Sequence, residues 1–347
     1  MGTANPVLAE VTRGSVAESL HRGTAAVVGA DGEVIAAWGD VDAPRYPRSA
    51  VKPLQAIPLV ASGAADAFSL GNDEIAISAA SHMAGRRHVA LVRDWLSRLG
   101  LSEADLVCGA IEPGDREEAA ALIKAGAKPT RAHNNCSGKH AGMLTTSLHA
   151  GLPASAYADA KGEEQRTIRK VLSDLSDFDL GGVEPAADGC GVPTLPMPIA
   201  GLARACARMA NPDGLKPDHG EAAKRIIAAM AAEPELVRGR GEFDTVAITA
   251  GNGAFVTKVG AEGVSAGIVP AKGIGIAVKI DDGGRRAADV VMANILDGLG
   301  VLDRNARNAL APWLVAPVPN TLGNRVGEVR PSEELKDGLT ALAGNPG

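Results

Sequence analysis

Short β-rich runs occur near both ends of this 347-residue chain, and that arrangement restricts its fold more than any other feature. Residues 23–38 predict a β-hairpin, because an Asp31-Gly32 turn signal separates two apolar runs. Glycines divide the last third into further short β-rich runs, which predict a meander. These runs are residues 245–249, 254–259, 264–269 and 274–280.

The residues between the two ends are mostly helical by their apolar spacing. The clearest helical segments are residues 88–99, 116–125, 138–149, 163–175 and 199–209, and a further helix over 285–299 follows the meander. We therefore expect an α/β (α+β) fold, with an antiparallel sheet built from both chain ends and a mainly helical second lobe. The chain would be a single module over 1–347, with lobes of about 1–60 plus 240–330 and about 61–239, and with its site in the cleft between them.

Composition excludes several classes of partner. Lys and Arg number 35 against 41 Asp and Glu, for a net charge of -6, which argues against nucleic acid or an anionic membrane as the partner. No apolar stretch approaches the ~20 residues of a membrane span, and the first residues do not resemble a signal peptide. With only four cysteines, a disulfide scaffold is not expected and a cytoplasmic location is.

The first motif with chemical potential is Ser49-Ala-Val-Lys52, at the start of a helix that Pro53 and Pro58 should kink or shorten. Residues i and i+3 share a helix face, so the lysine amine could reach the serine hydroxyl. A lysine whose pKa is lowered by burial can take the serine proton and make the hydroxyl nucleophilic. The alternative is a helix-capping serine beside a solvated lysine.

Two further segments could contribute to the same chemistry. The apolar run 75–80 is strand-like and places Ser81 and His82 at the end of an element, where a capping role is the alternative. Lys258-Val-Gly260 ends an expected strand. A Lys-x-Gly strand beside a Ser-x-x-Lys helix is the layout of penicillin-recognising serine enzymes, although Lys258 could equally be an ordinary surface lysine.

Two cysteines lie in segments that suit a metal. Cys136 belongs to His133-Asn-Asn-Cys-Ser-Gly-Lys-His140, at the expected start of a helix, and Cys190 lies in a glycine-flanked loop after Asp188. Two thiolates with one nitrogen donor suit zinc, with water in the fourth position. His140 would be the ordinary nitrogen donor and Lys139 an unusual one, because its amine must first lose a proton. Free buried cysteines are the alternative, as expected for Cys108 and Cys206.

Taken together, these segments resemble the Rhizobium etli-type (class 3) L-asparaginases. The residues that carry the resemblance run in order across nearly the whole chain: residues 48–55, 78–82, 134–143, 188–193 and 258–260. The block Asn-Asn-Cys-Ser-Gly-Lys-His at 134–140 is the most specific of them. The resemblance implies a fold similar to that of serine β-lactamases and glutaminases, and a homodimer.

The resemblance also assigns roles. It implies that Ser49 is the nucleophile with Lys52 as its base, and that Ser81 and Lys258 form a second pair. Its zinc ligands map to Cys136, Lys139 and Cys190. His140 and Asp188 would support the metal. Apart from the resemblance, asparagine is a zwitterion whose ammonium needs an anion and whose carboxylate needs donors, and Asp188 and Arg48 are candidates for these roles. Asn134 and His140 complete the expected substrate-binding residues. The chain departs from class A β-lactamases, because it has no Ser-Asp-Asn and carries Val259 where they have threonine.

The resulting hypothesis is an L-asparaginase that releases ammonia and L-aspartate from L-asparagine through a β-aspartyl ester on serine. Zinc would be structural or would position the substrate. Three alternatives stay open at this point: a β-lactam- or peptide-cleaving serine hydrolase, a zinc amidohydrolase whose metal is held by Cys136, Cys190 and His140, and a non-catalytic binding protein.

Overall fold

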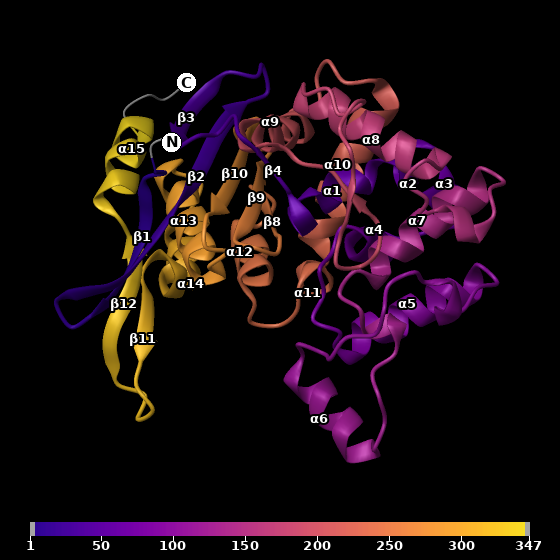
Figure 1. Ribbon diagram of the computed structural model, residues 1–347, viewed down its shortest axis with the longest axis horizontal. Helices are drawn as coiled ribbons and strands as arrows, with labels where there is room; N and C mark the ends of the chain where they lie inside the picture. The colour runs from indigo at the N-terminus through magenta and orange to yellow at the C-terminus, as the bar shows by residue number, and fades with distance from the viewer. Residues whose placement is uncertain (1–3, 344–347) are drawn as a thin grey trace. The chain divides into compact units, whose positions relative to one another are not determined.

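The computed structural model describes residues 4–343, which divide into two compact units (Figure 1). Unit 1 comprises residues 1–50, 197–211 and 246–347, and unit 2 comprises residues 51–196 and 212–245. The expected α/β (α+β) class, with a sheet made from both chain ends, is confirmed. The lobe boundaries expected from the sequence stay a prediction.

Unit 1 is built on one antiparallel sheet with the strand order β11-β12-β1-β2-β10-β9-β8 and with β3 paired to β2. Strand β2 is long enough for its first half to pair with β1 and its second half with β10. The strand bounds are β1 Val7–Arg13, β2 Val16–Gly29, β3 Val34–Trp38, β8 Val256–Val259, β9 Val264–Val269, β10 Ile274–Ile280, β11 Ala316–Pro319 and β12 Arg325–Pro331. The predicted hairpin and the last three runs of the predicted meander are confirmed.

Helices cover both faces of this sheet. A Cβ on Gly275 would meet the backbone of α9 (Ile199–Ala210), whereas one on Gly267, a register neighbour of Ile276, would meet Met292 of α13 (Arg285–Gly298). Successive strand residues face opposite sides, so α9 and α13 pack on opposite faces. Strands β8 to β10 are consequently buried on both sides and read as continuous apolar runs. Helices α14 (Arg304–Leu314) and α15 (Glu333–Ala343) complete the unit.

Unit 2 is helical around α7 (Ser137–His149), whose first eleven residues are all buried. Gly138 and Gly142 lie one turn apart on the face of α7 that meets α4 (Asn72–Ser78). A Cβ on Gly138 would lie 2.4 Å from the carbonyl oxygen of Ile77, so glycine is what lets the two helices approach. The remaining helices of unit 2 are α1 Lys52–Gln55, α2 Ile57–Ala61, α3 Ala64–Ala67, α5 Arg86–Arg98, α6 Arg116–Ala125, α8 Glu163–Ser176, α10 Pro217–Ala232 and α11 Pro234–Val237.

Two sequence expectations were wrong. The run before Ser81, expected as strand-like, forms helix α4, and residues 245–249 lie in helix α12 (Phe243–Gly251). Both segments are short and almost wholly buried, with Ile75, Ile77 and Ala247 at 0% exposure. A fully buried helix has no polar face, so its apolar run cannot be distinguished from a buried strand by periodicity.

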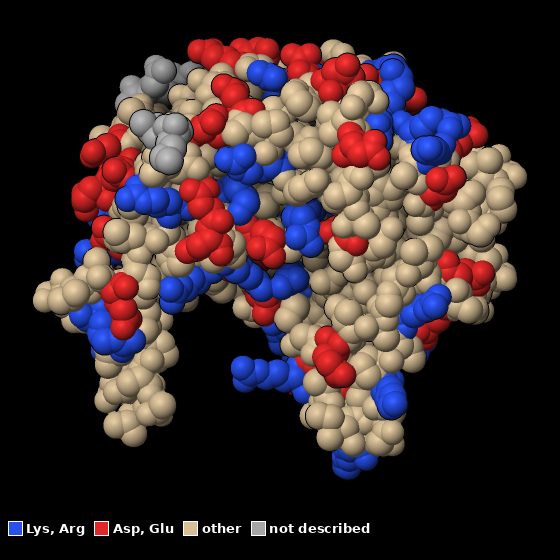
Figure 2. Space-filling model, in the orientation of Figure 1, with Lys and Arg blue, Asp and Glu red and all other residues tan. Residues whose placement is uncertain are grey.

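The break expected after Ser49 is present, because α1 and α2 are separate short helices, each with a proline in its first turn. No helix among residues 4–343 is both long and apolar enough to cross a membrane. Acidic and basic side chains are mixed on the face shown in Figure 2.

Candidate active site

Ser49 lies in the short 3-10 helix η1 (Arg48–Val51), directly after a residue with an unusual backbone. Arg48 has φ = 48°, in the left-handed region that a residue with a Cβ rarely adopts. Such strain is concentrated at functional sites, where the surrounding structure holds it in place. The backbone conformation of Arg48 therefore sets the direction in which the chain enters the turn that carries Ser49.

The end of strand β8 approaches this turn within unit 1. A Cβ on Gly260 would lie 3.3 Å from the backbone nitrogen of Ser49 and 3.0 Å from that of Ala50. Only glycine lets the strand end come this close without displacing the turn. Lys258, two residues earlier on the same edge strand, is 2% exposed, and its amine donates to the carbonyl oxygen of Val259 at 2.6 Å.

In unit 2, the amine of Lys52 lies next to Ser81. Lys52 is fully buried, and its Nζ is 3.0 Å from the Ser81 hydroxyl oxygen. It also donates to the carbonyl oxygens of Ala80 and Asn135. Burial is the main cause that lowers the Lys52 pKa, because an apolar interior disfavours the charged amine. A lysine in this state can accept a proton from a neighbouring hydroxyl.

The structure thus joins Lys52 to Ser81 by a hydrogen bond, a contact that the sequence did not predict. The pairs expected from the resemblance, Ser49 with Lys52 and Ser81 with Lys258, each combine a residue of unit 1 with one of unit 2. These pairings stay a prediction.

Three of the predicted metal ligands gather within unit 2. Cys136 precedes the first residue of α7, Lys139 lies in its first turn, and Cys190 lies in the turn between β5 (Ala186–Ala187) and β6 (Pro193–Thr194). The amine of Lys139 is 3.2 Å from Cys190 Sγ. All three side chains are buried, and neither cysteine forms a disulfide.

The electrostatics of this cluster favour a thiolate beside a cation. A hydrogen bond from Cys190, together with the charges of Lys52 and Lys139, holds the Cys136 pKa well below its usual range. The same hydrogen bond and burial raise the pKa of Cys190. Burial lowers the Lys139 pKa, but the two thiols and Asp188 outweigh it, and the net pKa is raised. The cluster therefore carries opposite charges that burial keeps close together.

The chemistry of this donor set fits zinc. Two sulfur atoms and one nitrogen are the atoms that Zn²⁺ prefers in a four-coordinate site. No group of three or more His, Cys, Asp or Glu side chains suited to a metal gathers within residues 4–343, so the alternative set of Cys136, Cys190 and His140 does not assemble. The set that does assemble has a lysine as its third member.

Tyr157 is a residue that sequence reasoning missed. Its hydroxyl accepts a hydrogen bond from the backbone of Val107 and lies 2.6 Å from Nδ1 of His140, and the two rings pack edge to face. With Nδ1 engaged in this way, Nε2 of His140 is buried without a hydrogen-bond partner. Burial holds the pKa of His140 well below its usual range, so the ring is neutral. The sequence offered one weak signal for this residue, which is that tyrosine is rare in the chain and occurs only twice.

The remaining predicted site residues have structural contacts of their own. The Asn134 side chain donates to the carbonyl oxygen of Gly109 and accepts from the backbone nitrogen of Cys136. Asp188 opens the tight turn that holds Cys190, with its Oδ2 4.0 Å from the sulfur. These contacts shape the loops around the cysteine cluster, and the roles of Arg48, Asn134 and Asp188 in binding substrate stay predictions.

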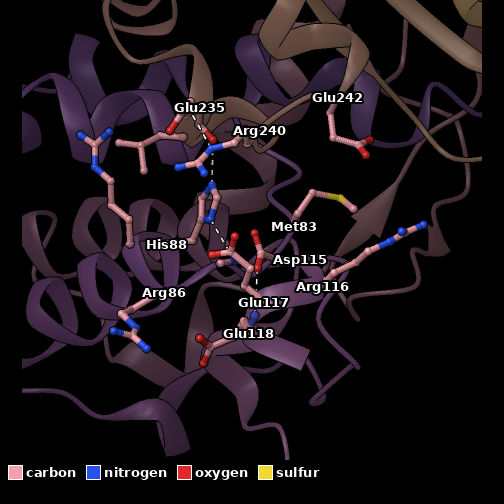
Figure 3. A pocket seen from close by; sticks show the side chains of 14 residues that line it. Met83, Arg86, His88, Asp115, Arg116, Glu117, Glu118, Glu235, Arg240 and Glu242 are labelled. Carbon is pink, nitrogen blue, oxygen red and sulfur yellow. Dashed lines mark hydrogen bonds and ion pairs between the residues drawn. The ribbon is translucent and has the colours of Figure 1, made fainter. Parts of the chain in front are cut away.

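A pocket of about 570 Å³ lies within unit 2, at the start of helices α5 and α6 (Figure 3). His88 points into it, and its Nε2 donates to the carbonyl oxygen of Glu235. His88 also stacks on His82, which follows Ser81 in the chain and whose Nε2 donates to Ser137. Arginines and carboxylates alternate around the pocket, and none of the predicted catalytic or metal residues lines it.

Comparisons with solved structures give low similarity. A crystal structure of Mglu matches with a TM-score of 0.47 and 13% identity, over 81% of this chain and 67% of that one. The chain covers only 57% and 63% of two further Mglu chains. A β-lactamase from Mycobacterium bovis matches with a TM-score of 0.39 and 16% identity, over 84% of this chain and 94% of that one. These scores carry no argument about function, and no curated protein matches the sequence.

The sequence matches one protein family over most of its length. The family model described as L-asparaginase II matches residues 9–331, which is nearly the whole chain. The match spans all five segments that carried the resemblance in the sequence, and it confirms both the expected family and the expectation of an enzyme. The chain belongs to the L-asparaginase II family, and this membership indicates an amidohydrolase that acts on asparagine.

Proposed function

We propose that the protein hydrolyses the side-chain amide of L-asparagine through an acyl-enzyme on Ser49. The observation that carries the mechanism is the Lys52 amine, which is fully buried, has a lowered pKa and lies 3.0 Å from the Ser81 hydroxyl. A base in this state is what a serine hydrolase without a histidine base requires.

In the first step, neutral Lys52 accepts the proton of the Ser49 hydroxyl, with Ser81 as relay. Ser49 Oγ attacks the amide carbon, protonated Lys52 gives its proton to the amide nitrogen, and the carbon–nitrogen bond breaks so that ammonia leaves and Lys52 is neutral again. A β-aspartyl ester of Ser49 remains. Water then attacks the ester and gives a proton to Lys52, which passes it to the leaving Ser49 oxygen, so that L-aspartate is released and the Ser49 hydroxyl is restored.

Lys258 would complete the site from the strand side. Its position on edge strand β8, with Gly260 packed against the Ser49 turn, supports a role in binding the reacting carboxamide. Its positive charge would also favour the neutral form of a nearby lysine. Backbone N–H groups of the Ser49 turn are the candidate donors for the developing oxyanion.

We further propose that Cys136, Lys139 and Cys190 hold zinc, with Asp188 and His140 in support. When bound, zinc would supply a fixed positive centre that orders the cysteine loops and helps to position the substrate. The two buried thiols and the sulfur–amine contact of this cluster support the proposal, and Lys139 would have to give up its proton when it binds the metal. A Cys136→Ser variant should lose most of its zinc by elemental analysis, compared with a Cys206→Ser control whose thiol lies in the core of unit 1.

The serine mechanism is tested by Ser49→Ala. This variant should release no measurable ammonia from asparagine, whereas Ser15→Ala, an exposed serine in the β1–β2 turn, should match the wild type. Mass spectrometry of a quenched wild-type reaction should find the aspartyl adduct on Ser49. Turnover by Ser49→Ala at the wild-type rate would contradict the mechanism while leaving asparaginase activity itself in place.

Two other expectations are part of this proposal. A homodimer should give twice the 35.2 kDa chain mass in light scattering. A cytoplasmic location should leave the activity in the soluble fraction of lysed cells after the periplasmic contents are removed.

A further inference from the structure

A second pocket of unit 2 lies apart from the residues discussed so far. It has a volume of about 270 Å³ and is bordered by helices α2, α7, α8 and the start of α10. Its walls are largely apolar, with contributions from Pro58, Leu152 and Val171. A cavity of this size holds a small molecule rather than a macromolecular segment.

The unusual feature of this pocket is Glu164. The residue is 4% exposed and lines the cavity from the first turn of α8. Within residues 4–343 its carboxyl group makes no hydrogen bond and no ion pair. Burial, and to a smaller extent the neighbouring Glu163, raises the pKa of Glu164 to about 8. The carboxyl group therefore has no protein partner where it borders the cavity, and a buried carboxyl in such a place is normally compensated by a donor or a cation.

Two more carboxylates and two histidines face the pocket, and the carboxylates add negative potential. Glu163 lies beside Glu164 on α8, and Asp218 and His219 face it from α10. His149 faces it from α7, with its Nε2 at 3.1 Å from the carbonyl oxygen of Ser62. No lysine or arginine lines the pocket, so it is complementary to a positive charge. These carboxylates and histidines do not gather into a metal-binding group among the described residues.

We propose that this pocket binds a protonated amine, with the ammonium group on Glu164 and any attached carbon chain against the apolar walls. The N–H groups of the ligand would give the buried carboxyl the donors that it lacks, and the opposite charges would offset its desolvation. Two sources share this chemistry: free ammonium and a small aliphatic amine. The proposal does not depend on the function proposed for Ser49 and Lys52.

Calorimetric titration with n-butylammonium chloride tests the proposal on the intact protein. Glu164 must lose its proton before it can pair with the cation, so binding at pH 7 should release close to one proton per site. The heat should therefore change with the ionisation enthalpy of the buffer. With a pKa of about 8, only about one carboxyl in eleven is ionised at pH 7, so affinity should rise about tenfold between pH 7 and pH 9.

Glu164→Gln should weaken butylammonium binding more than about tenfold, because it removes the charge and keeps the shape. The matched control is Glu184→Gln, an exposed carboxylate of unit 2 that does not line the pocket, which should change affinity less than about threefold. Titration with ammonium chloride identifies the source: tighter binding of butylammonium assigns the site to an aliphatic amine, and equal or tighter binding of ammonium assigns it to free ammonium. Absence of binding by both cations, or binding without proton release by the wild type, would overturn the proposal even if the Glu164 variant did not fold.

Discussion

The interiors of the two units differ in kind. The interior of unit 1 is largely aliphatic, and among its described residues the buried acidic, basic and histidine side chains are His21, Lys258 and Asp289. The interior of unit 2 contains many buried ionisable groups: Lys52, Glu74, His82, His88, His133, Lys139, His140, Glu164 and Asp244. Each such group lowers the free energy of unfolding unless a partner compensates its burial. The buried polar groups therefore reduce the stability of unit 2 more than that of unit 1.

This difference indicates that the interior of unit 1 is mainly structural, whereas the interior of unit 2 holds groups that can react. The chemistry that unit 1 offers is confined to one edge, where Lys258 and Gly260 meet the Ser49 turn. Unit 2 instead holds its titratable groups around the buried start of α7, where pKa values are shifted in both directions. Opposed shifts of neighbouring groups are typical of functional sites. Disturbing unit 1 away from this edge should therefore change stability alone, whereas disturbing the start of α7 in unit 2 should change both stability and chemistry.

The largest effect is expected for Gly275→Ala in unit 1. A Cβ there would lie 1.9 Å from the carbonyl oxygen of Ala203 and 2.3 Å from the backbone nitrogen of Ala207, both in α9. Because backbone atoms cannot rotate away, α9 must shift from the sheet, at a cost of more than about 3 kcal/mol. Urea unfolding measures the loss. The folded fraction should keep the wild-type kcat for asparagine, and a large fall in kcat would break the proposed separation.

Gly138→Ala makes the corresponding change in unit 2. The new Cβ would lie 2.4 Å from the carbonyl oxygen of Ile77 and would push the start of α7 away from α4. We expect a loss of about 2 to 3 kcal/mol in stability. Here kcat should also fall at least tenfold, because Cys136 and Lys139 lie on the displaced turn. Gly126→Ala, at the exposed C-terminal end of α6, is the control and should leave kcat unchanged.

The buried carboxyl of unit 2 should make stability depend on pH. The folded-state pKa of Glu164 is about 8, above its ordinary value of 4.5, so the stabilising form is the protonated one. Its contribution is complete below about pH 4.5 and is lost as the pH rises through about 8. Compared with Glu164→Gln, the wild type should lose on the order of 2 kcal/mol between pH 6 and pH 8. Parallel unfolding curves for the two proteins over this range would show that Glu164 is not desolvated.

The local pattern of apolar residues and glycines was sufficient to predict many of the helices and strands. The predicted segments 116–125, 264–269 and 274–280 coincide with α6, β9 and β10, because each has a distinct apolar period or clear glycine boundaries. Strand β1 was missed, and α4 and α12 were assigned to the wrong class. Burial on nearly all sides removes the periodicity on which such predictions depend, and this explains the errors at α4 and α12.

The site could be predicted as a set of residues but not as a set of contacts. Cys136 and Cys190 are recognisable as possible donors, and the structure brings Lys139 within 3.2 Å of Cys190 across 51 positions of sequence. The hydrogen bond from Lys52 to Ser81 had no local signal, because it depends on how α1 packs near the end of α4. Glu164 was equally hidden, since an acidic residue in the first turn of an amphipathic helix is ordinary.

The smallest effect is expected for Tyr157→Phe, which removes one hydroxyl from the buried polar interior of unit 2. Two partners lose their hydrogen bond: the backbone nitrogen of Val107 and Nδ1 of His140. Val107 is 46% exposed, so water can replace the hydroxyl there, whereas His140 is fully buried and cannot be compensated in this way. We therefore expect a loss of about 1 kcal/mol rather than twice that amount. Thermal unfolding measures the loss, and a second cycle in a His140→Gln background shows where it arises. If the hydroxyl acts through His140, Tyr157→Phe should lower the free energy of unfolding clearly less in the His140→Gln background than in the wild type. An equal loss in both backgrounds would assign the stabilisation to the Val107 hydrogen bond instead.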